Sequence, residues 1–346
     1  MATMTHDTAL VVSRRARVGF GFAALAAASF ALSGALASSL LGAGWSPAAL
    51  VLCRIVVGAL VLTGPAVVAL RGRWHLLRAH APLLVAYGLV AVAGCQLAYF
   101  NAVDRLPVAV ALLIEYTAPV AVIGWLWARH GQRPTRLTLV GAAVAGGGLM
   151  LVLDVMNAGA VDGLGVVWGL LAMAGCAFFF VVSASDDDVL PPIVLAAGGL
   201  VVGAVGLAVA AALGLVTLTT STADAAYRGT SVPWWLPVLA LGVITAAVAY
   251  VAGILAARGL GARMASFAAL PEVLFAVVFA WLLLGQLPLP VQLLGGVFVL
   301  AGVVLVKLGE PRPREAVVLD PGTRDDGPGA ARNDPSPDGS VARARA

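Results

Sequence analysis

The stretch GQRPTRLTLVGAAVAGGGLML, residues 131–151, returns later in the chain as GQLPLPVQLLGGVFVLAGVVL, residues 285–305. At a constant separation of 154 residues, the identical pairs are Gly131/Gly285, Gln132/Gln286, Pro134/Pro288, Gly141/Gly295, Gly148/Gly302 and Leu151/Leu305. A weaker match at a separation of 145 residues pairs Pro47, Leu50 and Gly58 with Pro192, Leu195 and Gly203. Together the two matches indicate an internal repeat.

The composition around this repeat is that of a membrane protein. Of 346 residues, 61% are hydrophobic and 11% are charged, and the mean hydropathy of +0.99 lies outside the usual range of soluble domains. The charged residues separate apolar segments of about 20 residues, the length that lets a helix cross the hydrocarbon core. These segments lack the alternation of transmembrane barrel strands, so the sequence predicts an all-α membrane protein.

Glycine, proline and charge clusters divide the chain into ten predicted transmembrane helices. Their ranges are 18–41, 47–70, 82–103, 107–128, 137–153, 163–184, 191–216, 235–257, 264–284 and 290–308. One side of the membrane receives Arg14, Arg15, Arg17, Arg71, Arg73, Arg78, Arg129, Arg133, Arg136, Arg258, Arg263 and Lys307, and the other side receives Arg105 and Arg228. The positive-inside rule therefore predicts a multi-pass protein of the plasma membrane with both termini in the cytoplasm.

The segments outside these helices carry few structural signals. Residues 1–17 are expected to form a cytoplasmic N-terminal segment. Residues 310–346 are rich in Pro, Gly, Asp and Arg, which predicts a disordered cytoplasmic tail. The acidic run Asp186 to Asp188 is interpreted as a solvated loop, with a gate or a partner contact as the alternative.

The repeat assigns five spans to each half, 18–153 and 163–308. Because five is an odd number, the second half must enter the membrane in the opposite orientation, which makes the two halves inverted repeats. Inverted repeats recur in secondary transporters, where two halves rock around a site near the membrane midplane. The alternative is a duplication that was retained only for stability.

The same residues resemble the EamA-type branch of the drug/metabolite transporter (DMT) superfamily. The segment LPEVLFAVVFAWLLLGQLPLPVQLLGGVFVLAGVVLV, from Leu270, is similar to that family's closing motif, and PAALVLCRIVVGALVL, from Pro47, is similar to its second-helix motif with the arginine at Arg54. The segment LPVAVALLIEYTAPVAV, from Leu106, resembles the fourth helix of exporters of the threonine/homoserine type. One departure is Gln286, where the family usually has glutamate. The resemblance implies a transporter fold and the export of amino acids or related compounds.

Three ionisable residues lie inside predicted spans: Arg54, Glu115 and Glu272. An ionised side chain at the centre of a lipid-facing helix costs about 2.5 to 3.5 kcal/mol, so such groups usually face a cavity or a partner. Arg54 and Glu115 lie at similar depths, about 10 and 12 Å from the outer face. We expect them to pair, or to face a water-filled cavity where Arg54 receives a carboxylate. The alternative is that Arg54 snorkels to the headgroups and Glu115 makes a structural contact.

The two glutamates are not equivalent in the repeat. At the separation of 154 residues Glu115 corresponds to Ala269, three residues before Glu272. Pro119 and Pro271 remove backbone hydrogen bonds nearby, which predicts a gate or a kink without function. Burial disfavours the charged form of a carboxylate and a nearby arginine favours it, so Glu115 and Glu272 are candidate proton sites.

Uncharged polar residues also fall within the spans. The candidates for lining a cavity are Gln96, Tyr99, Asn101, Tyr116 and Tyr250. Their polar atoms would bind a small zwitterion or join neighbouring helices.

Other classes of protein fit the sequence less well. The three cysteines lie in apolar runs and the four histidines lie outside the predicted hydrocarbon layer, so no metal, cofactor or membrane enzyme is expected. No P-loop indicates direct use of ATP, and the dispersed basic residues do not indicate nucleic acid. The sequence therefore predicts a secondary carrier that exports a small polar metabolite. The alternatives are an importer or drug-efflux carrier of the same fold, and a membrane scaffold without transport.

Overall fold

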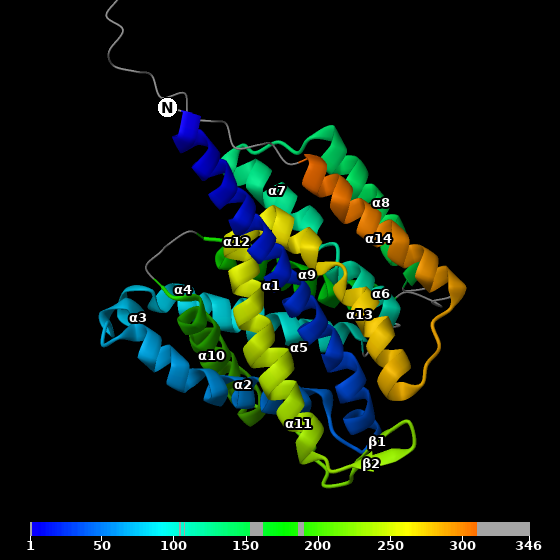
Figure 1. The fold of residues 1–346 in the computed structure, drawn as a ribbon. Helices are drawn as coiled ribbons and strands as arrows, with labels where there is room; N and C mark the ends of the chain where they lie inside the picture. Colours follow the sequence, from blue (N-terminus) through cyan, green and yellow to red (C-terminus); the bar gives the residue numbers. More distant parts are fainter. Residues whose placement is uncertain (1, 104, 107, 153–161, 186–189, 310–346) are drawn as a thin grey trace, which may run out of the picture. The chain divides into compact units, whose positions relative to one another are not determined.

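A computed structural model describes residues 2–103, 105–106, 108–152, 162–185 and 190–309. The described residues up to 309 belong to one unit, which is mainly helical (Figure 1). The predicted acidic loop at Asp186 to Asp188 and the predicted tail, 310–346, lie outside the described residues.

The helical segments alternate between long helices and shorter pieces. The first part of the chain forms α1 (Ala2–Gly42), α2 (Pro47–Leu70), α3 (His75–Ala79), α4 (Ala81–Ala86), the π-helix η1 (Tyr87–Gly94), α5 (Cys95–Val103), α6 (Val108–Glu115), α7 (Ala118–His130) and α8 (Arg136–Val152). The second part forms α9 (Gly163–Ser183), α10 (Pro192–Ala212), β1 (Ala225–Tyr227), β2 (Thr230–Val232), α11 (Trp235–Gly242), the π-helix η3 (Val243–Val248), α12 (Ala249–Ala269), α13 (Glu272–Phe279), the π-helix η4 (Ala280–Leu284) and α14 (Pro290–Gly309).

Eight of the described helices are long and apolar enough to cross a membrane, and Arg136–Val152 and Glu272–Leu284 are shorter apolar helices. The protein is therefore a multi-pass membrane protein. One candidate span is the continuous segment Trp235–Ala269, where the sequence predicts two helices. That segment contains a kink at Gly261, whose φ of 79° and ψ of 159° are not helical and favour glycine. The predicted gap between the eighth and ninth helices thus contains a kink rather than a loop.

Two predicted spans are interrupted near their middle. The fourth is broken between Glu115, where α6 ends, and Ala118, where α7 begins. The ninth is broken between Ala269, where α12 ends, and Glu272, where α13 begins. Nearby prolines explain both breaks, because proline has no N–H to donate and its ring clashes with the preceding turn. Both pairs of boundaries are 154 residues apart, so the breaks lie at equivalent positions of the repeat.

The repeated glycines bring α8 and α14 together, and the two helices lie side by side in Figure 1. A Cβ atom on Gly148 would lie 2.6 Å from the carbonyl oxygen of Gly295, and one on Gly141 would lie 2.8 Å from that of Gly302. Residue numbers rise on one helix as they fall on the other, so the helices are antiparallel. Small residues permit this close approach of two backbones in a membrane protein.

A second pair of contacts follows the same repeat. A Cβ atom on Gly58 would lie 2.8 Å from Cβ of Ala246 in η3, and one on Gly203 would lie 2.9 Å from Cγ1 of Val92 in η1. Residues 92 and 246 are again 154 positions apart. The two halves therefore place small residues at matching helix contacts.

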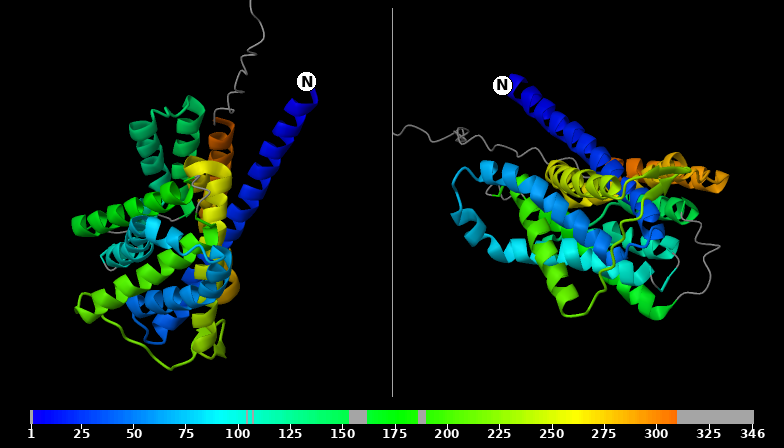
Figure 2. Two further views of the ribbon diagram at one scale, coloured as in Figure 1. Left: turned by 90° about the vertical axis from the view of Figure 1, so that its left-hand side faces the viewer. Right: turned by 90° about the horizontal axis from the view of Figure 1, so that it is seen from below.

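A β-hairpin that the sequence did not predict connects α10 to α11. It lies at the end of α1 opposite the N-terminus (Figures 1 and 2). Its two-residue turn has left-handed backbone angles, with φ of 47° at Arg228 and 80° at Gly229, which is typical of tight hairpins. Tyr227 Oη donates to the Leu36 carbonyl at 2.9 Å, and Ser39 Oγ donates to the Ala226 carbonyl at 2.7 Å. The hairpin is thereby fastened to α1.

Candidate functional site

The three charged residues predicted inside spans lie close enough to interact electrostatically. Arg54 comes from α2, Glu115 from the end of α6, and Glu272 from the start of α13. Each side chain is half-buried, so part of its surface is accessible. The structure thus brings together residues that are up to 218 positions apart in the chain.

Arg54 is bound mainly by uncharged groups. Its Nη2 donates to the Thr245 carbonyl at 2.7 Å, and its Nη1 donates to Oε1 of Gln96 at 3.4 Å. The guanidinium carbon lies 5.8 Å from the centre of the Phe30 ring. Among the described residues, the buried Nε has no hydrogen-bond partner. These contacts direct the guanidinium toward η3 and α5 rather than toward the end of its own helix.

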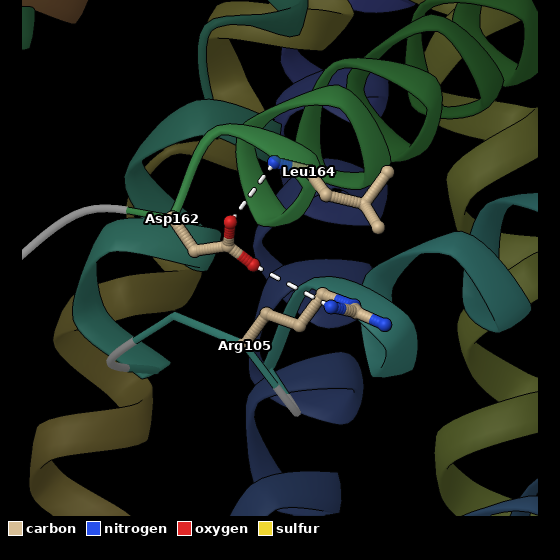
Figure 3. Close-up of polar contacts among 3 residues, drawn as sticks. All are labelled: Arg105, Asp162 and Leu164. Carbon is tan, nitrogen blue, oxygen red and sulfur yellow. Dashed lines mark hydrogen bonds and ion pairs between the residues drawn. The ribbon is translucent and has the colours of Figure 1, made fainter.

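The predicted ion pair between Arg54 and Glu115 does not form. Among the described residues, an ion pair joins Arg105 and Asp162 at 3.6 Å (Figure 3), and none joins Arg54 to Glu115. Asp162 also accepts the Leu164 N–H at 3.2 Å, which caps α9. This exposed pair joins the segment after α5 to the residue that precedes α9. Arg54 therefore acts on the two carboxylates through space.

Among the described residues, Glu115 receives one weak donor. The thiol of Cys95 lies 3.6 Å from Glu115 Oε1 and also 3.3 Å from the Ala172 carbonyl, so a single S–H is divided between two acceptors. The main-chain carbonyl of Glu115 lacks the amide donor that a continuous helix would supply, because position 119 is proline. Glu115 thus has unused acceptor capacity in its side chain and its main chain.

Glu272 lies near a tyrosine of the first half. Its carboxyl group and the Tyr116 hydroxyl are close enough to interact electrostatically. Tyr116 lies in the break between α6 and α7, and Glu272 follows the break between α12 and α13. The two equivalent breaks of the repeat therefore place Tyr116 and Glu272 near each other.

Gln96 and Tyr250 extend this polar group. Gln96 Nε2 donates to the Tyr250 hydroxyl at 3.4 Å, while its Oε1 accepts from Arg54. The Tyr250 ring is buried and packs edge-on against Phe30 and Phe179, with centroid separations of 5.4 and 5.8 Å. Arg54, Gln96 and Tyr250 form one chain of contacts across α2, α5 and α12.

The other two predicted cavity residues differ from each other. Tyr99 lies close enough to Glu115 and Glu272 to interact with both electrostatically. Asn101 donates from Nδ2 to the Leu97 carbonyl of its own helix at 2.8 Å, which is a local contact. Tyr99 therefore belongs with the central group, whereas Asn101 is bound to the backbone of α5.

Several members of the group could not be identified from the sequence. From the sequence alone, Cys95 is expected to behave as a small apolar residue and Phe30 as a residue of the helix packing. The Thr245 carbonyl is presented by a π-helix, and hydropathy patterns do not distinguish π from α turns. Within the described part of the chain, no cluster of three or more His, Cys, Asp or Glu residues could bind a metal ion.

Comparison with known proteins assigns this arrangement to a family. The profile of the EamA-like transporter family matches residues 17–154 and again residues 163–308. One solved structure, described only as the crystal structure of a protein, is similar with a TM-score of 0.68 and 19% sequence identity, over 86% of this chain and 97% of that one. At this identity the likeness shows a shared fold. A comparison with curated proteins found no match. The two profile matches together cover most of the chain, which therefore belongs to the EamA-like transporter family.

Proposed function

We propose that this membrane transporter is a secondary carrier that moves a small polar metabolite by alternating access. The main support is the proximity of Tyr116 and Glu272, which lie at the two equivalent helix breaks, and of both to Glu115. Secondary carriers commonly build their sites at breaks in membrane helices, because the freed backbone groups can face a ligand there. The proposed substrate site is formed by Arg54, Glu115 and Glu272.

The proposal includes ten spans in two inverted five-helix repeats, 18–153 and 163–308. The antiparallel packing of α8 and α14 supports it, since these helices begin at Arg136 and Pro290, 154 residues apart. The contact between Gly141 and Gly302 becomes the contact between Gly148 and Gly295 when the repeats are exchanged. A twofold axis between the two halves would produce such a contact surface, in which each contact has an equivalent after the halves are exchanged.

The direction and the substrate class rest on the resemblance of the fourth helix to amino-acid exporters of the threonine/homoserine type. We propose outward transport of an amino acid or a related compound across the plasma membrane, with both termini in the cytoplasm. An importer and a drug-efflux carrier remain the alternatives of the same fold, and a scaffold without transport is the alternative of another class.

Proton coupling through Glu115 or Glu272 is a further part of the proposal. Two carboxylates share one neighbourhood with a single arginine, so a bound proton would relieve their mutual repulsion. Dissipating the pH gradient across the membrane of transporting cells should then slow transport. An unchanged rate would remove the proton from the mechanism and leave the carrier itself intact.

The test of the carrier is a metabolite profile inside and outside cells. It compares an empty vector, the wild type, Glu115→Gln and the control Asp224→Asn at matched membrane levels. Asp224 belongs to the exposed segment before the hairpin, so this control makes the same chemical change away from the proposed site. We expect the wild type and the control to enrich a specific compound outside the cell, and Glu115→Gln to abolish the enrichment. A wild-type profile equal to the vector on both sides of the membrane would refute transport.

A further inference from the structure

The turns that follow α7 and η4 are equivalent in the repeat and have the same backbone hydrogen bonds. In each turn a glycine and the glutamine after it donate to the preceding helix: Gly131 to Trp127, Gln132 to Leu126, Gly285 to Trp281 and Gln286 to Ala280. The two glycines have left-handed φ angles of 65° and 75°. Gln132 and Gln286 therefore lie in the same structural setting, one in each half.

Gln132 accepts hydrogen bonds from an arginine that has no equivalent in the other half. Nη2 of Arg263 lies 3.4 Å from the main-chain oxygen of Gln132 and 3.4 Å from its side-chain Oε1. At the separation of 154 residues, Arg263 corresponds to Ala109, whose side chain has no donor. The contact can therefore form at only one of the two equivalent turns.

We propose that the contact between Arg263 and Gln132 is a cytoplasmic gate, which holds the carrier closed on that side and favours the state that is open to the outside. Arg263 belongs to the second half and Gln132 to the first, so the contact must break when the halves separate at the cytoplasmic face. The inference rests on the proposed carrier function with inverted repeats. It adds a one-sided control of the equilibrium between the two open states.

The first support is the burial of Arg263. In the described part of the chain it is the most buried charged residue, with 6% of its surface exposed. The positive-inside rule assigns it to the cytoplasmic side, where water would solvate its charge if the halves were apart. Withdrawing a guanidinium group from water is costly unless it is hydrogen-bonded. The partners at Gln132 therefore matter most in the closed arrangement.

The second support is the apolar packing beside the gate. Met264 and Phe267 follow Arg263 in α12, and both are buried in a cluster that also contains Ile123 and Leu149 of the first half. This cluster joins the two halves on the same side as the gate. Opening the cytoplasmic side would therefore expose these side chains as well as Arg263.

The third support is the moderate strength of the contact. Distances of 3.4 Å are long for hydrogen bonds, and among the described residues the buried Nε of Arg263 has no partner. Water would supply acceptors to all five N–H groups of the guanidinium once the halves part. A contact shifts an equilibrium only by the difference in its free energy between the two states. The gate can therefore favour the closed side and still open in each cycle.

The experiment measures the opening of the cytoplasmic side by cysteine labelling. The parent chain has its three cysteines replaced by serine and carries Met264→Cys as a reporter. A membrane-impermeant maleimide is added to inside-out vesicles, and the labelling rate of the parent is compared with that of the parent carrying Arg263→Leu. We expect Arg263→Leu to raise the rate by about tenfold or more, because hydrogen bonds from a charged group have been lost.

The two equivalent turns supply a matched pair of variants. Gln132→Ala removes one of the two acceptors of Arg263 and should raise the labelling rate by a smaller factor than Arg263→Leu. Gln286→Ala makes the same change in the equivalent turn and should leave the rate unchanged. Both glutamines are exposed, so neither change disturbs the core.

A second reporter separates a shift between states from unfolding. Leu113→Cys replaces a half-buried residue at the position equivalent to Phe267, on the outer side of the break at Glu115. In intact cells its labelling should become slower when Arg263→Leu is added, because the outward-open state is less populated. Unfolding would instead raise the labelling of both reporters.

Each contrary outcome contradicts a particular statement. Equal labelling of Met264→Cys with and without Arg263→Leu would overturn the gate, and so would a rise of both reporters. Equal rises for Gln132→Ala and Gln286→Ala would overturn its restriction to one side. Labelling does not measure transport, so the gate can fail while the metabolite profile still supports the carrier.

Discussion

At the scale of single residues, Tyr116 and Glu272 lie near each other at the equivalent breaks of the two halves. Tyr116→Phe removes the hydroxyl and preserves the ring, so Glu272 loses a nearby polar group. We expect the initial rate of transport to fall by about tenfold or more, because a hydroxyl that donates to a charged carboxylate during transport would form one of the stronger hydrogen bonds in proteins. The rate is measured with the compound that the metabolite profile identifies.

Tyr227→Phe is the matched control for this change. Its hydroxyl donates to the Leu36 carbonyl in the hairpin, away from the charged group, and its loss should leave the transport rate unchanged. A Tyr116→Phe variant that transports as fast as the wild type would show that transport does not depend on the Tyr116 hydroxyl.

Arg54, Glu115 and Glu272 could be selected as site candidates from sequence because burial of a charge is costly anywhere in a membrane. Their partners could not be predicted. Whether Arg54 meets Glu115 or the Thr245 carbonyl depends on the rotation of α2 and on the π turns of η3, and neither leaves a signal in hydropathy. Sequence therefore identified the charges but not the hydrogen bonds.

At the scale of secondary-structure elements, the packing of α8 against α14 depends on particular glycines. Gly148→Ala would place a Cβ atom 2.6 Å from the Gly295 carbonyl oxygen, so the two helices must separate. The neighbouring Gly147 has open space around its Cβ position. We expect Gly148→Ala to cost about 1 to 3 kcal/mol of stability through overpacking, which thermal unfolding of the purified protein in detergent would report as a lower Tm.

Gly147→Ala is the control, because it makes the same change from glycine to alanine at the neighbouring position of α8. It should leave Tm unchanged or raise it, since alanine is favoured over glycine in a helix by about 1 kcal/mol. Equal Tm values for the two variants would mean that α8 and α14 do not approach as closely as the structure shows.

The order of the helices was accessible from sequence because each apolar segment must cover the thickness of the bilayer. The hairpin at Ala225–Val232 was not, because its strands are only three residues each and lie between apolar helices. The prolines at positions 119 and 271 indicated disturbed helices, but the exact equivalence of the breaks depends on packing between the halves. Local sequence thus predicts the apolar helices better than the breaks within them.

At the scale of the whole molecule, the proposed inversion of the two repeats makes a prediction about sidedness. The loop before α8 and the loop before α14 are equivalent, and positions 133 and 287 correspond at the separation of 154 residues. Both side chains are exposed. If the repeats are inverted, these two positions lie on opposite sides of the membrane, and the positive-inside rule assigns Arg133 to the cytoplasm.

Single-cysteine variants test this directly in a background where Cys53, Cys95 and Cys176 are replaced by serine. A membrane-impermeant maleimide added to intact cells should label Leu287→Cys and leave Arg133→Cys unlabelled, and both should react once the membranes are broken. The background chain without cysteine measures non-specific labelling. Labelling of both variants in intact cells would mean that the two halves have the same orientation. The helices α8 and α14 could not then cross the membrane antiparallel, and the proposed alternating access between two inverted halves would be refuted.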